Sequence, residues 1–189
     1  MRVQSFARAL AAAAVLASSL AACAPAANRE AVAVPATVQG AVALADGGEL
    51  RIEETRGHVV VLAFFTTWCP ASPAALRAVE ELRTRNAGRD LEVIAVGEGT
   101  SAEEVSAFAN KLGVRAAVAF DMGGALASQL RLPTVPAVIV IARDGTIRHV
   151  HAGYHGEDDR TEINREVTAL LEAAMPSEPG EPAQRVARQ

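Results

Sequence analysis

Apolar and polar positions follow two different periods along the middle of this chain. The run from 59 to 65 contains only apolar residues, which is typical of a strand in a sheet that is covered on both faces. Apolar residues then recur at helical spacing at Leu76, Val79 and Leu82. A second strand is predicted over 91–96, so this part of the chain is expected to form a βαβ unit.

The remaining pattern predicts a helix, a short strand with a short helix, a hairpin and a terminal helix. Ser101 and Glu104 have the spacing of a capping box at the start of the first of these helices. Asp144-Gly145 is a strong hairpin signal between two apolar stretches. The elements are a strand at 118–120, a short helix near 124–130, hairpin strands at 137–142 and 147–150, an apolar helix face at Val105, Phe108, Ala109 and Leu112, and another at Ile163, Val167, Leu170, Leu171 and Ala174. Together they predict an α/β fold with a mixed central sheet and helices on both faces.

The start of the chain has the features of an export signal. Arg2 and Arg8 make it basic, and residues 9–20 form an Ala-rich apolar run. A helix that spans a bilayer needs about 20 apolar residues, so this run is short for a stable anchor. Residues 20–23, Leu-Ala-Ala-Cys, resemble a bacterial lipobox, in which the signal is cut before the cysteine and the cysteine is then lipidated. An ordinary cleaved signal with an incidental Cys23 is the alternative.

The composition predicts one folded domain with a tail on either side. An Ala/Pro-rich stretch with little periodicity precedes the domain and is expected to be a tether, and the Pro-rich polar end of the chain is expected to be disordered. A chain of 189 residues suits this arrangement. The expected boundaries are a lipoprotein signal peptide at 1–22, a tether at 23–36, a folded domain at 37–175 and a disordered tail at 176–189.

Charge and cysteine content limit the binding partners and the disulfides that this protein is expected to have. Removal of the signal leaves 16 basic and 22 acidic side chains, a formal net charge of −6, and no basic block indicates a nucleic-acid partner. We expect a monomer attached to the membrane through the lipid on Cys23, facing the periplasm or another extracytoplasmic space, with no cofactor and no metal. With Cys23 lipidated, Cys69 is the only thiol, so no intramolecular disulfide can form, although an exported protein could carry one.

The residues Trp68-Cys69-Pro70 carry the most specific chemistry of the sequence. They follow the apolar strand and open the first helix, where the helix N–H groups favour the thiolate form of a cysteine. The spacing is that of a C-x-x-C redox motif, but Ser72 stands at the position of the second cysteine. We expect Trp68 to shield the sulfur on one side and the Ser72 hydroxyl to hydrogen-bond the thiolate.

A dithiol oxidoreductase needs both cysteines of such a motif. The first thiolate attacks a substrate disulfide and forms a mixed disulfide, which the second thiol then cleaves. Cys69 can perform the first step, but Ser72 forms no S–S bond and cannot perform the second. The structural alternatives are a small buried core residue for Cys69 and a polar residue of the helix N-terminus for Ser72.

Residues 40–145 resemble the thioredoxin-like proteins of the TlpA/ResA type, which are membrane-tethered thiol–disulfide oxidoreductases of the bacterial cell envelope. The resemblance implies a thioredoxin-like fold with an N-terminal β-hairpin, in which Ser72 replaces the resolving cysteine. Four segments carry it, in this order: the hairpin turn Leu44-Ala45-Asp46-Gly47-Gly48, the start of the central strand Arg56-Gly57-His58-Val59-Val60-Val61, the active-site approach Phe64-Phe65-Thr66-Thr67-Trp68-Cys69-Pro70, and the loop Thr134-Val135-Pro136 with the hairpin at 137–145 after it.

The resemblance also implies roles outside the cysteine motif. Thr134, Val135 and Pro136 would form a cis-proline loop whose backbone pairs with the substrate, and an ordinary proline at a strand edge is the alternative. Two departures from the family weaken proton handling. Ala63 stands where classical thioredoxins carry a buried aspartate, and residues 73–75, Pro-Ala-Ala, replace charged residues that often follow the second cysteine.

These observations leave more than one class of function open. In the favoured class, Cys69 exchanges with disulfides, mixed disulfides or sulfenic acids on envelope proteins, and an external thiol completes the cycle. In the second, the domain is a non-catalytic module that binds extended polypeptide beside Pro136. A one-cysteine peroxidase is a further alternative, because Thr66-x-x-Cys69 is similar to the peroxidatic motif of peroxiredoxins, although the proline expected near Leu62 is missing.

A glycine-containing segment is superficially similar to a dinucleotide-binding fingerprint. Gly97-Glu98-Gly99 follows a strand and precedes a helix, and Asp121 lies further along the chain. Glu98 would repel a pyrophosphate, however, and two turn glycines before a capped helix explain the pattern without a ligand.

Three histidines lie close together in the sequence. His149 and His151 are expected on one face of a strand, and together with His155 they could bind a metal. We favour the simpler interpretation, in which the histidines face solvent from an exposed strand.

Overall fold

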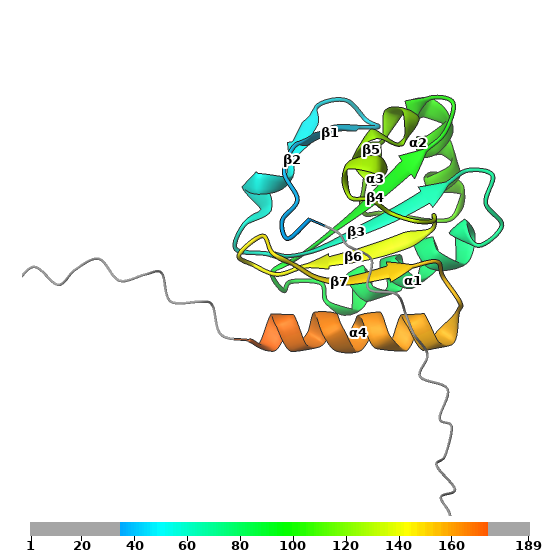
Figure 1. Cartoon of the computed structure of the whole chain (residues 1–189). Coiled ribbons are helices and arrows are strands. Elements are labelled where there is room, and N and C mark those ends of the chain that lie inside the picture. The colour runs from blue at the N-terminus through cyan, green and yellow to red at the C-terminus, as the bar shows by residue number, and fades with distance from the viewer. Residues whose placement is uncertain (1–34, 174–189) are drawn as a thin grey trace, which may run out of the picture. The chain divides into compact units, whose positions relative to one another are not determined.

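A seven-stranded mixed sheet organises residues 35–173, which are the residues that the computed structural model describes (Figure 1). The predicted signal, Cys23, nearly all of the tether and the C-terminal tail lie outside the described residues. The strands are β1 (Ala41–Leu44), β2 (Glu49–Arg51), β3 (Val59–Thr66), β4 (Leu91–Glu98), β5 (Ala117–Phe120), β6 (Ala137–Ile141) and β7 (Ile147–Ala152). The helices are α1 (Ser72–Arg85), α2 (Ala102–Lys111), α3 (Ala125–Gln129) and α4 (Glu157–Glu172), with short 3₁₀ segments η1 (Ile52–Thr55) and η2 (Met122–Gly124).

The strand order is β2-β1-β5-β4-β3-β6-β7, which places β3 at the centre of the buried part of the sheet. β3 pairs in parallel with β4 along its whole length, and β4 pairs in parallel with β5. β6 runs antiparallel to β3 on its other side and continues into β7 through the predicted Asp144-Gly145 turn. The N-terminal hairpin of β1 and β2 pairs with β5, so the predicted mixed sheet is confirmed.

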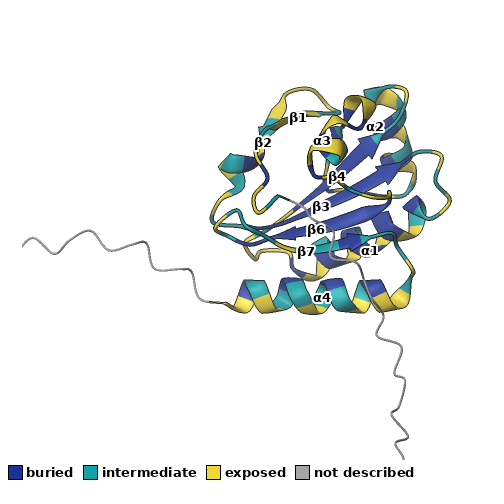
Figure 2. Ribbon diagram, in the orientation of Figure 1, coloured by how far each residue is buried: buried dark blue, intermediate teal, exposed yellow. Residues whose placement is uncertain are grey.

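Both faces of the sheet are covered, as the sequence predicts. Alternate residues of β3 contact the two opposite layers: Val61 and Phe65 belong to one, Leu62 and Phe64 to the other. Figure 2 shows β3, β4 and β6 as the most completely buried strands. The first layer comes from α1, α2 and α4, and its helical members are Leu76, Val79, Leu82, Val105, Ala109, Ile163, Val167 and Leu171. The second comes from α3, η1 and the N-terminal segment, with Leu126, Leu130, Ile52, Val38 and Val42.

The start of α2 has half of the predicted capping box. The Glu104 N–H donates to Ser101 Oγ at 3.2 Å, as expected for a serine N-cap. The Glu104 carboxylate, however, accepts from the N–H of Thr100 at 2.8 Å rather than from the N–H of the cap residue. The side chain is therefore turned toward the loops in front of the helix, which affects the site described below.

Gly97 is a correction to the sequence analysis, because it lies inside β4 and not in a turn. It faces Phe65 of β3 in register. A Cβ at this position would lie 2.4 Å from Val105 Cγ1 and 2.6 Å from Phe65 Cζ, which is closer than packed atoms come. Glycine at 97 therefore allows α2 to approach the sheet closely.

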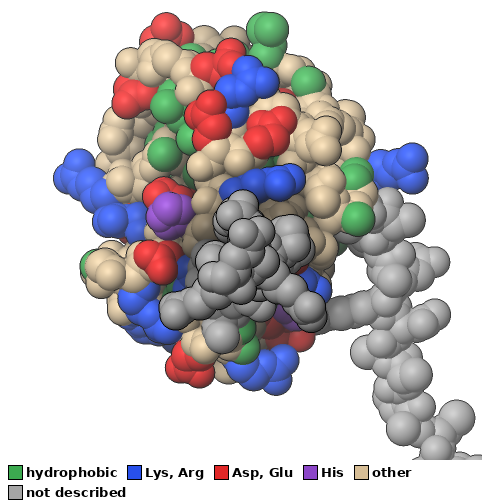
Figure 3. Space-filling model, turned by 90° about the vertical axis from the view of Figure 1, so that its left-hand side faces the viewer, with side chains coloured by type: hydrophobic (Ala, Val, Ile, Leu, Met, Phe, Trp, Pro, Cys, Tyr) green, Lys and Arg blue, Asp and Glu red, His purple; other side chains and the backbone are tan. Residues whose placement is uncertain are grey.

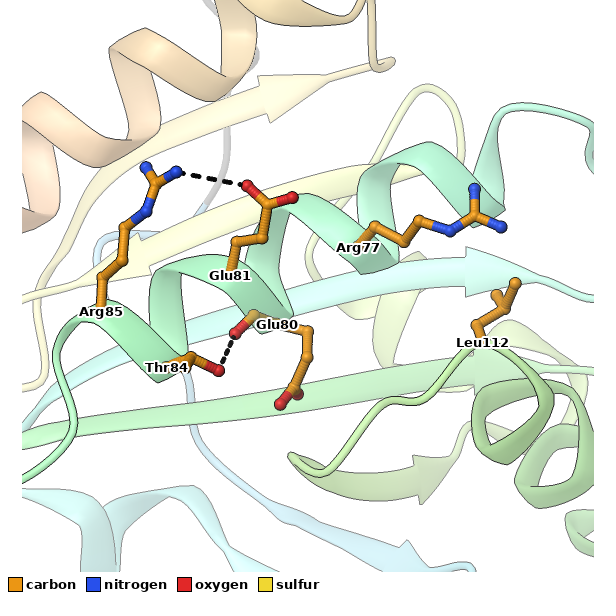
Figure 4. Close-up of a pocket in the computed structure, with 6 residues that line it drawn as sticks. All are labelled: Arg77, Glu80, Glu81, Thr84, Arg85 and Leu112. Carbon is orange, nitrogen blue, oxygen red and sulfur yellow. Dashed lines mark hydrogen bonds and ion pairs between the residues drawn. The ribbon is translucent and has the colours of Figure 1, made fainter.

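Glu80 joins α1 to the segment that leads into β5. Its carboxylate accepts from Arg83 Nε at 3.0 Å and from the backbone N–H groups of Arg115 at 2.9 Å and Ala116 at 3.1 Å. Figure 4 shows the Glu80 side chain on the opposite side of α1 from the side chains of Glu81 and Arg85. Burial opposes ionisation of Glu80, but the hydrogen bonds from Arg83 and from the two backbone groups lower its pKa.

We expect Glu80→Gln to destabilise the fold by about 1.5–3 kcal/mol at pH 7, the usual worth of hydrogen bonds to a charged group. Because the pKa of Glu80 is lowered on folding, its contribution is complete above the ordinary carboxyl value of 4.5 and is lost as the pH falls through the lowered value. Urea unfolding of both proteins between pH 7 and pH 3 measures this. The difference in unfolding free energy should narrow below pH 4.5, and a difference that stays constant with pH would contradict the assignment.

Candidate functional site

Cys69 lies in the turn between the end of β3 and the start of α1. The N–H of Ser72 donates to the Cys69 carbonyl at 3.1 Å, and Ala71 has helical backbone angles, so the first helical turn already begins at the cysteine. Pro70 is exposed within this turn, and Cys69 itself is half-buried and free. A partly exposed cysteine at the start of a helix matches the expected position of a reactive thiol.

Trp68 is a large apolar residue that is 63% exposed. A large exposed aromatic side chain beside a thiol offers apolar area to a bound molecule. The expected shielding of the sulfur by Trp68 stays a prediction, because this exposure alone does not place the ring against Sγ.

Ser72 is completely buried, and its hydroxyl oxygen accepts a hydrogen bond from the N–H of Thr66 at 3.2 Å. It thereby joins the last residue of β3 to the first residue of α1. The expected hydrogen bond from Ser72 to the Cys69 thiolate stays a prediction: the hydroxyl can still donate its proton, but the bond that the structure shows is to Thr66.

Glu104 is a member of the site that the sequence analysis treated only as a helix cap. Its Oε1 accepts from the Thr67 hydroxyl at 2.5 Å, and its Oε2 accepts from both the N–H and the hydroxyl of Thr100. The hydrogen bonds from Thr100 and Thr67 lower the pKa of Glu104, so the group is a carboxylate near neutral pH. One anionic side chain thus fixes the loops after β3 and β4, and the β3 loop carries Cys69. The signal in the sequence is a threonine just after each of two neighbouring parallel strands.

The predicted cis-proline loop lies at the same edge of the sheet as Cys69. The Val135–Pro136 peptide bond is cis, as the resemblance implied. Ala137, the next residue, pairs with Phe64 near the end of β3, so the loop is brought beside the turn that carries the cysteine. Thr134 is exposed, Val135 is half-buried and Pro136 is buried.

Asp121, the acidic residue of the apparent dinucleotide fingerprint, has a structural role instead. Its two carboxylate oxygens accept from the N–H groups of Leu126 at 2.8 Å and Ala127 at 3.0 Å. These are N–H groups of the first turn of α3, so Asp121 caps that helix. With Gly97 inside a strand, neither end of the pattern is arranged for a dinucleotide.

The expectation that the histidines face solvent is wrong for His151, which is 7% exposed. The expectation that His149 and His151 share one face is confirmed, because both contact the carboxylate of Glu166 on α4, at 2.9 and 2.7 Å. The face of β7 that carries them is covered by α4, which the sequence pattern of the strand does not reveal. His155 lies in the following loop and contacts Asp159.

Comparison with known proteins supports the resemblance seen in the sequence. The thiol–disulfide oxidoreductase ResA of Geobacillus kaustophilus is 26% identical over 113 residues, which cover 60% of this chain and 65% of that relative. Among solved structures, a protein assigned as the thiol:disulfide interchange protein DsbE of Chlorobium tepidum matches with a TM-score of 0.68 and 20% identity, over 73% of this chain and 96% of that one. The exposed lipoprotein thioredoxin Etrx1 of Streptococcus pneumoniae matches with a TM-score of 0.57 and 22% identity, over 68% and 99%.

At these identities the solved structures establish the fold, which is thioredoxin-like. The sequence itself matches the model of the AhpC/TSA family over residues 30–150, well over half of the chain. This stretch contains the β3–α1 turn with Cys69, Glu104 and the cis-proline loop. The chain therefore belongs to the AhpC/TSA family, and ResA-type thiol–disulfide oxidoreductases are among its relatives.

Proposed function

We propose that this protein is a thiol–disulfide exchange protein that uses Cys69 as its single reactive thiol. The observation that carries the proposal is the position of Cys69: it is half-exposed, in the turn before α1, at the sheet edge that also carries the loop from Thr134 to Pro136. The name of the relative ResA, a thiol–disulfide oxidoreductase, supports the same chemistry.

The reaction has two steps. The Cys69 thiolate attacks one sulfur of a protein disulfide or mixed disulfide, a new S–S bond to Cys69 forms, and the other sulfur leaves as a thiolate. With a sulfenic acid as partner, the same attack forms the S–S bond and releases water after protonation of the leaving hydroxide. An external thiolate then attacks the mixed disulfide and returns Cys69 to its reduced form, with the electrons supplied by that thiol. Ser72 takes no part in the cleavage because a hydroxyl forms no S–S bond.

Trapping of covalent partners tests this function. Because no second thiol lies in the turn, mixed disulfides at Cys69 should be long-lived, and purification without reductant should recover proteins that dithiothreitol releases. Cys69→Ser should lose them all. The native thiol should also react with iodoacetamide at least as fast as the same thiol in urea, because Cys69 is half-exposed in the folded turn. A slower native reaction together with no releasable adducts would support the non-catalytic polypeptide-binding module instead.

A one-cysteine peroxidase is the second candidate. The match to the AhpC/TSA family supports it, and so does the environment of the Thr66 hydroxyl. The Thr66 hydroxyl is buried and has no hydrogen-bond partner among the described residues, three positions before the cysteine. In such a reaction, the Cys69 thiolate attacks one peroxide oxygen, the O–O bond breaks, and Cys69 becomes a sulfenic acid. The other oxygen leaves as hydroxide or alkoxide and is protonated to water or an alcohol. Peroxide consumption that depends on Cys69 and Thr66 and is sustained by added thiol would select this function.

We further propose that the protein is attached to the bacterial cell envelope by lipid on Cys23, with the domain on the extracytoplasmic side. The lipobox-like residues 20–23 support it, and the solved relative Etrx1 is itself an exposed lipoprotein. Within residues 35–173, no helix has both the length and the apolar character that crossing a bilayer requires. We expect intact-mass analysis of the membrane fraction to show a chain that begins at a diacyl- or triacylglyceryl Cys23. A soluble product cut at another bond would overturn this.

A further inference from the structure

We propose that β7, α4 and the loop between them form a binding site for a divalent transition-metal ion, with His151, Asp159 and Glu162 as its ligands. One possible ligand atom from each of the three residues lies within 4.8 Å of the other two. His151 and Asp159 are 7% and 2% exposed, whereas Glu162 is half-buried at the rim. The three residues come from a strand and from the first two turns of a helix, so rigid elements hold them together.

The surroundings of His151 are those of a metal-binding imidazole. Its Nε2 lies 2.7 Å from Glu166 Oε2, while Glu166 Oε1 lies 2.9 Å from His149 Nδ1. A histidine ligand usually donates its second ring N–H to a carboxylate, which fixes the tautomer and the orientation of the ring. Donation from Nε2 to Glu166 would leave the lone pair of the imidazole on Nδ1 as the donor to an ion.

The loop before α4 holds Asp159 in a similar way. Asp159 Oδ2 accepts from the N–H of His155 at 2.5 Å and lies 3.1 Å from His155 Nδ1. A Cβ at Gly153 would lie 2.9 Å from His155 Cε1, so glycine at 153 leaves room for the His155 ring. The His155 side chain is mostly exposed and stands next to Asp159, where it can serve as a fourth ligand or leave that position to water.

Charge also favours a cation here. Asp159, Glu162 and Glu166 bring three carboxylates together beneath β7, and burial of carboxylates is costly unless a cation compensates them. Arg160 on the same helix binds Glu81 and Glu157, and Arg165, with most of its surface exposed, lies 3.7 Å from Glu162 at the rim of the cluster. Histidines contact both Asp159 and Glu166, and a divalent ion bound here would add positive charge beside these carboxylates.

The donor set selects the kind of ion. One imidazole nitrogen with two carboxylates suits Zn²⁺ and its neighbours Co²⁺, Fe²⁺ and Mn²⁺, whereas Mg²⁺ and Ca²⁺ prefer oxygen ligands alone. Bonds of about 2.0–2.1 Å in a tetrahedral zinc site place its ligand atoms roughly 3.3 Å apart. On binding, the three ligand atoms would have to approach that spacing from their present separations of up to 4.8 Å.

A bound ion would also affect the cis-proline loop, because the segment that the ion holds is hydrogen-bonded to that loop. The N–H of Gly153, at the start of the β7–α4 loop, donates to the carbonyl of Pro136 at 3.0 Å. An ion bound by His151 and Asp159 would therefore fix the segment against which the cis-proline loop rests. Binding of an ion at this site does not involve the Cys69 thiol, so it can be measured in a variant without that thiol.

The test uses the chain with Cys69→Ala, so that the thiol cannot bind the metal, after removal of metals with EDTA. Titration with Zn²⁺ against a chromophoric chelator should show one site, and Zn²⁺ should raise the thermal midpoint while equimolar Mg²⁺ does not. His151→Gln and Glu162→Gln should each weaken binding at least about 100-fold, and Glu166→Gln about 10-fold, the range found for outer-sphere partners. His58→Gln is the matched control and should bind as the parent does.

Co²⁺ provides a readout that misfolding does not imitate. The parent should show the visible absorption bands of nitrogen- and oxygen-bound Co²⁺, and Glu162→Gln, at the accessible rim, should change them while the far-UV spectrum stays native. Equal zinc affinity in the parent, His151→Gln and Glu162→Gln would overturn the proposal, as would equal responses to Zn²⁺ and Mg²⁺. The cluster would then be a network of contacts between histidines and carboxylates without a metal ion.

Discussion

Ser72→Cys is expected to raise turnover in a disulfide-reduction assay with insulin and dithiothreitol by at least about tenfold. The substitution places a second thiol in the same helical turn as Cys69, since the N–H of Ser72 already donates to the Cys69 carbonyl. Cleavage of the mixed disulfide then becomes intramolecular, and well-oriented intramolecular reactions gain effective concentrations far above those of added thiols. The wild type must wait for an external thiol in every cycle.

The same substitution should cost some stability. Ser72 is fully buried and its oxygen accepts from the N–H of Thr66, whereas sulfur is a weak acceptor. A buried donor left without a good partner costs about 1–3 kcal/mol. Ser72→Ala is the matched control, because it loses the same acceptor without gaining a thiol, and it should not gain turnover. A wild type that already turns over as fast as Ser72→Cys would contradict the single-thiol mechanism.

The central strands and the turn with Cys69 were predictable from the sequence because their signals are local. An uninterrupted apolar run at 59–65 has few alternatives to a strand buried on both faces, and the structure extends it by one residue to Thr66. The proline at 136 was assigned to a cis bond from its place in a recognisable segment, and the bond is cis. The strand is predicted from its own residues alone, whereas the cis bond is implied by the resemblance of residues 134–136 to the thioredoxin-like family.

The side-chain partners within the site could not be predicted in the same way. Thr67 and Glu104 are 37 residues apart, and their hydrogen bond depends on β3 and β4 being neighbours with loops at the same edge. The spacing from Ser101 to Glu104 predicts a reciprocal cap. In the structure the Glu104 carboxylate accepts hydrogen bonds from the hydroxyls of Thr67 and Thr100 instead.

His149 and His151 show that the alternation of side chains along a strand predicts which residues share a face, but not whether that face is buried. Alternation places His149 and His151 on one face of β7, and this is confirmed by their common contact with Glu166. Whether that face meets water depends on where α4 packs. The helix buries Ile163 and Val167 against the sheet and thereby carries Glu166 over the strand. The sequence of β7 therefore predicts which histidines share a face, whereas the burial of that face depends on the apolar residues of α4.

Gly97→Ala is expected to destabilise the fold by about 1–3 kcal/mol, the usual cost of forcing an extra carbon into a packed core. The new Cβ would lie 2.4 Å from Val105 Cγ1 and 2.6 Å from Phe65 Cζ, and both neighbours are at most 1% exposed. Phe65 is further held by its ring stacking on Phe108, at a centroid distance of 5.8 Å. Urea unfolding should show a lower midpoint with an unchanged slope, because the surface exposed on unfolding stays the same.

The clash with Val105 can be separated from any other effect of the extra carbon by a double mutant. Val105→Ala alone removes two buried methyl groups and leaves a cavity, which should also be destabilising. In Gly97→Ala/Val105→Ala the new Cβ can occupy part of that space, so the double mutant should be more stable than the sum of the two single effects predicts, by about 0.5 kcal/mol or more. Strict additivity would show that the contact with Val105 is not the reason for glycine at position 97.

Gly97→Ala should also change the alkylation rate of Cys69, because Phe65 precedes Thr66, whose N–H donates to Ser72. Adding Val105→Ala should restore the rate.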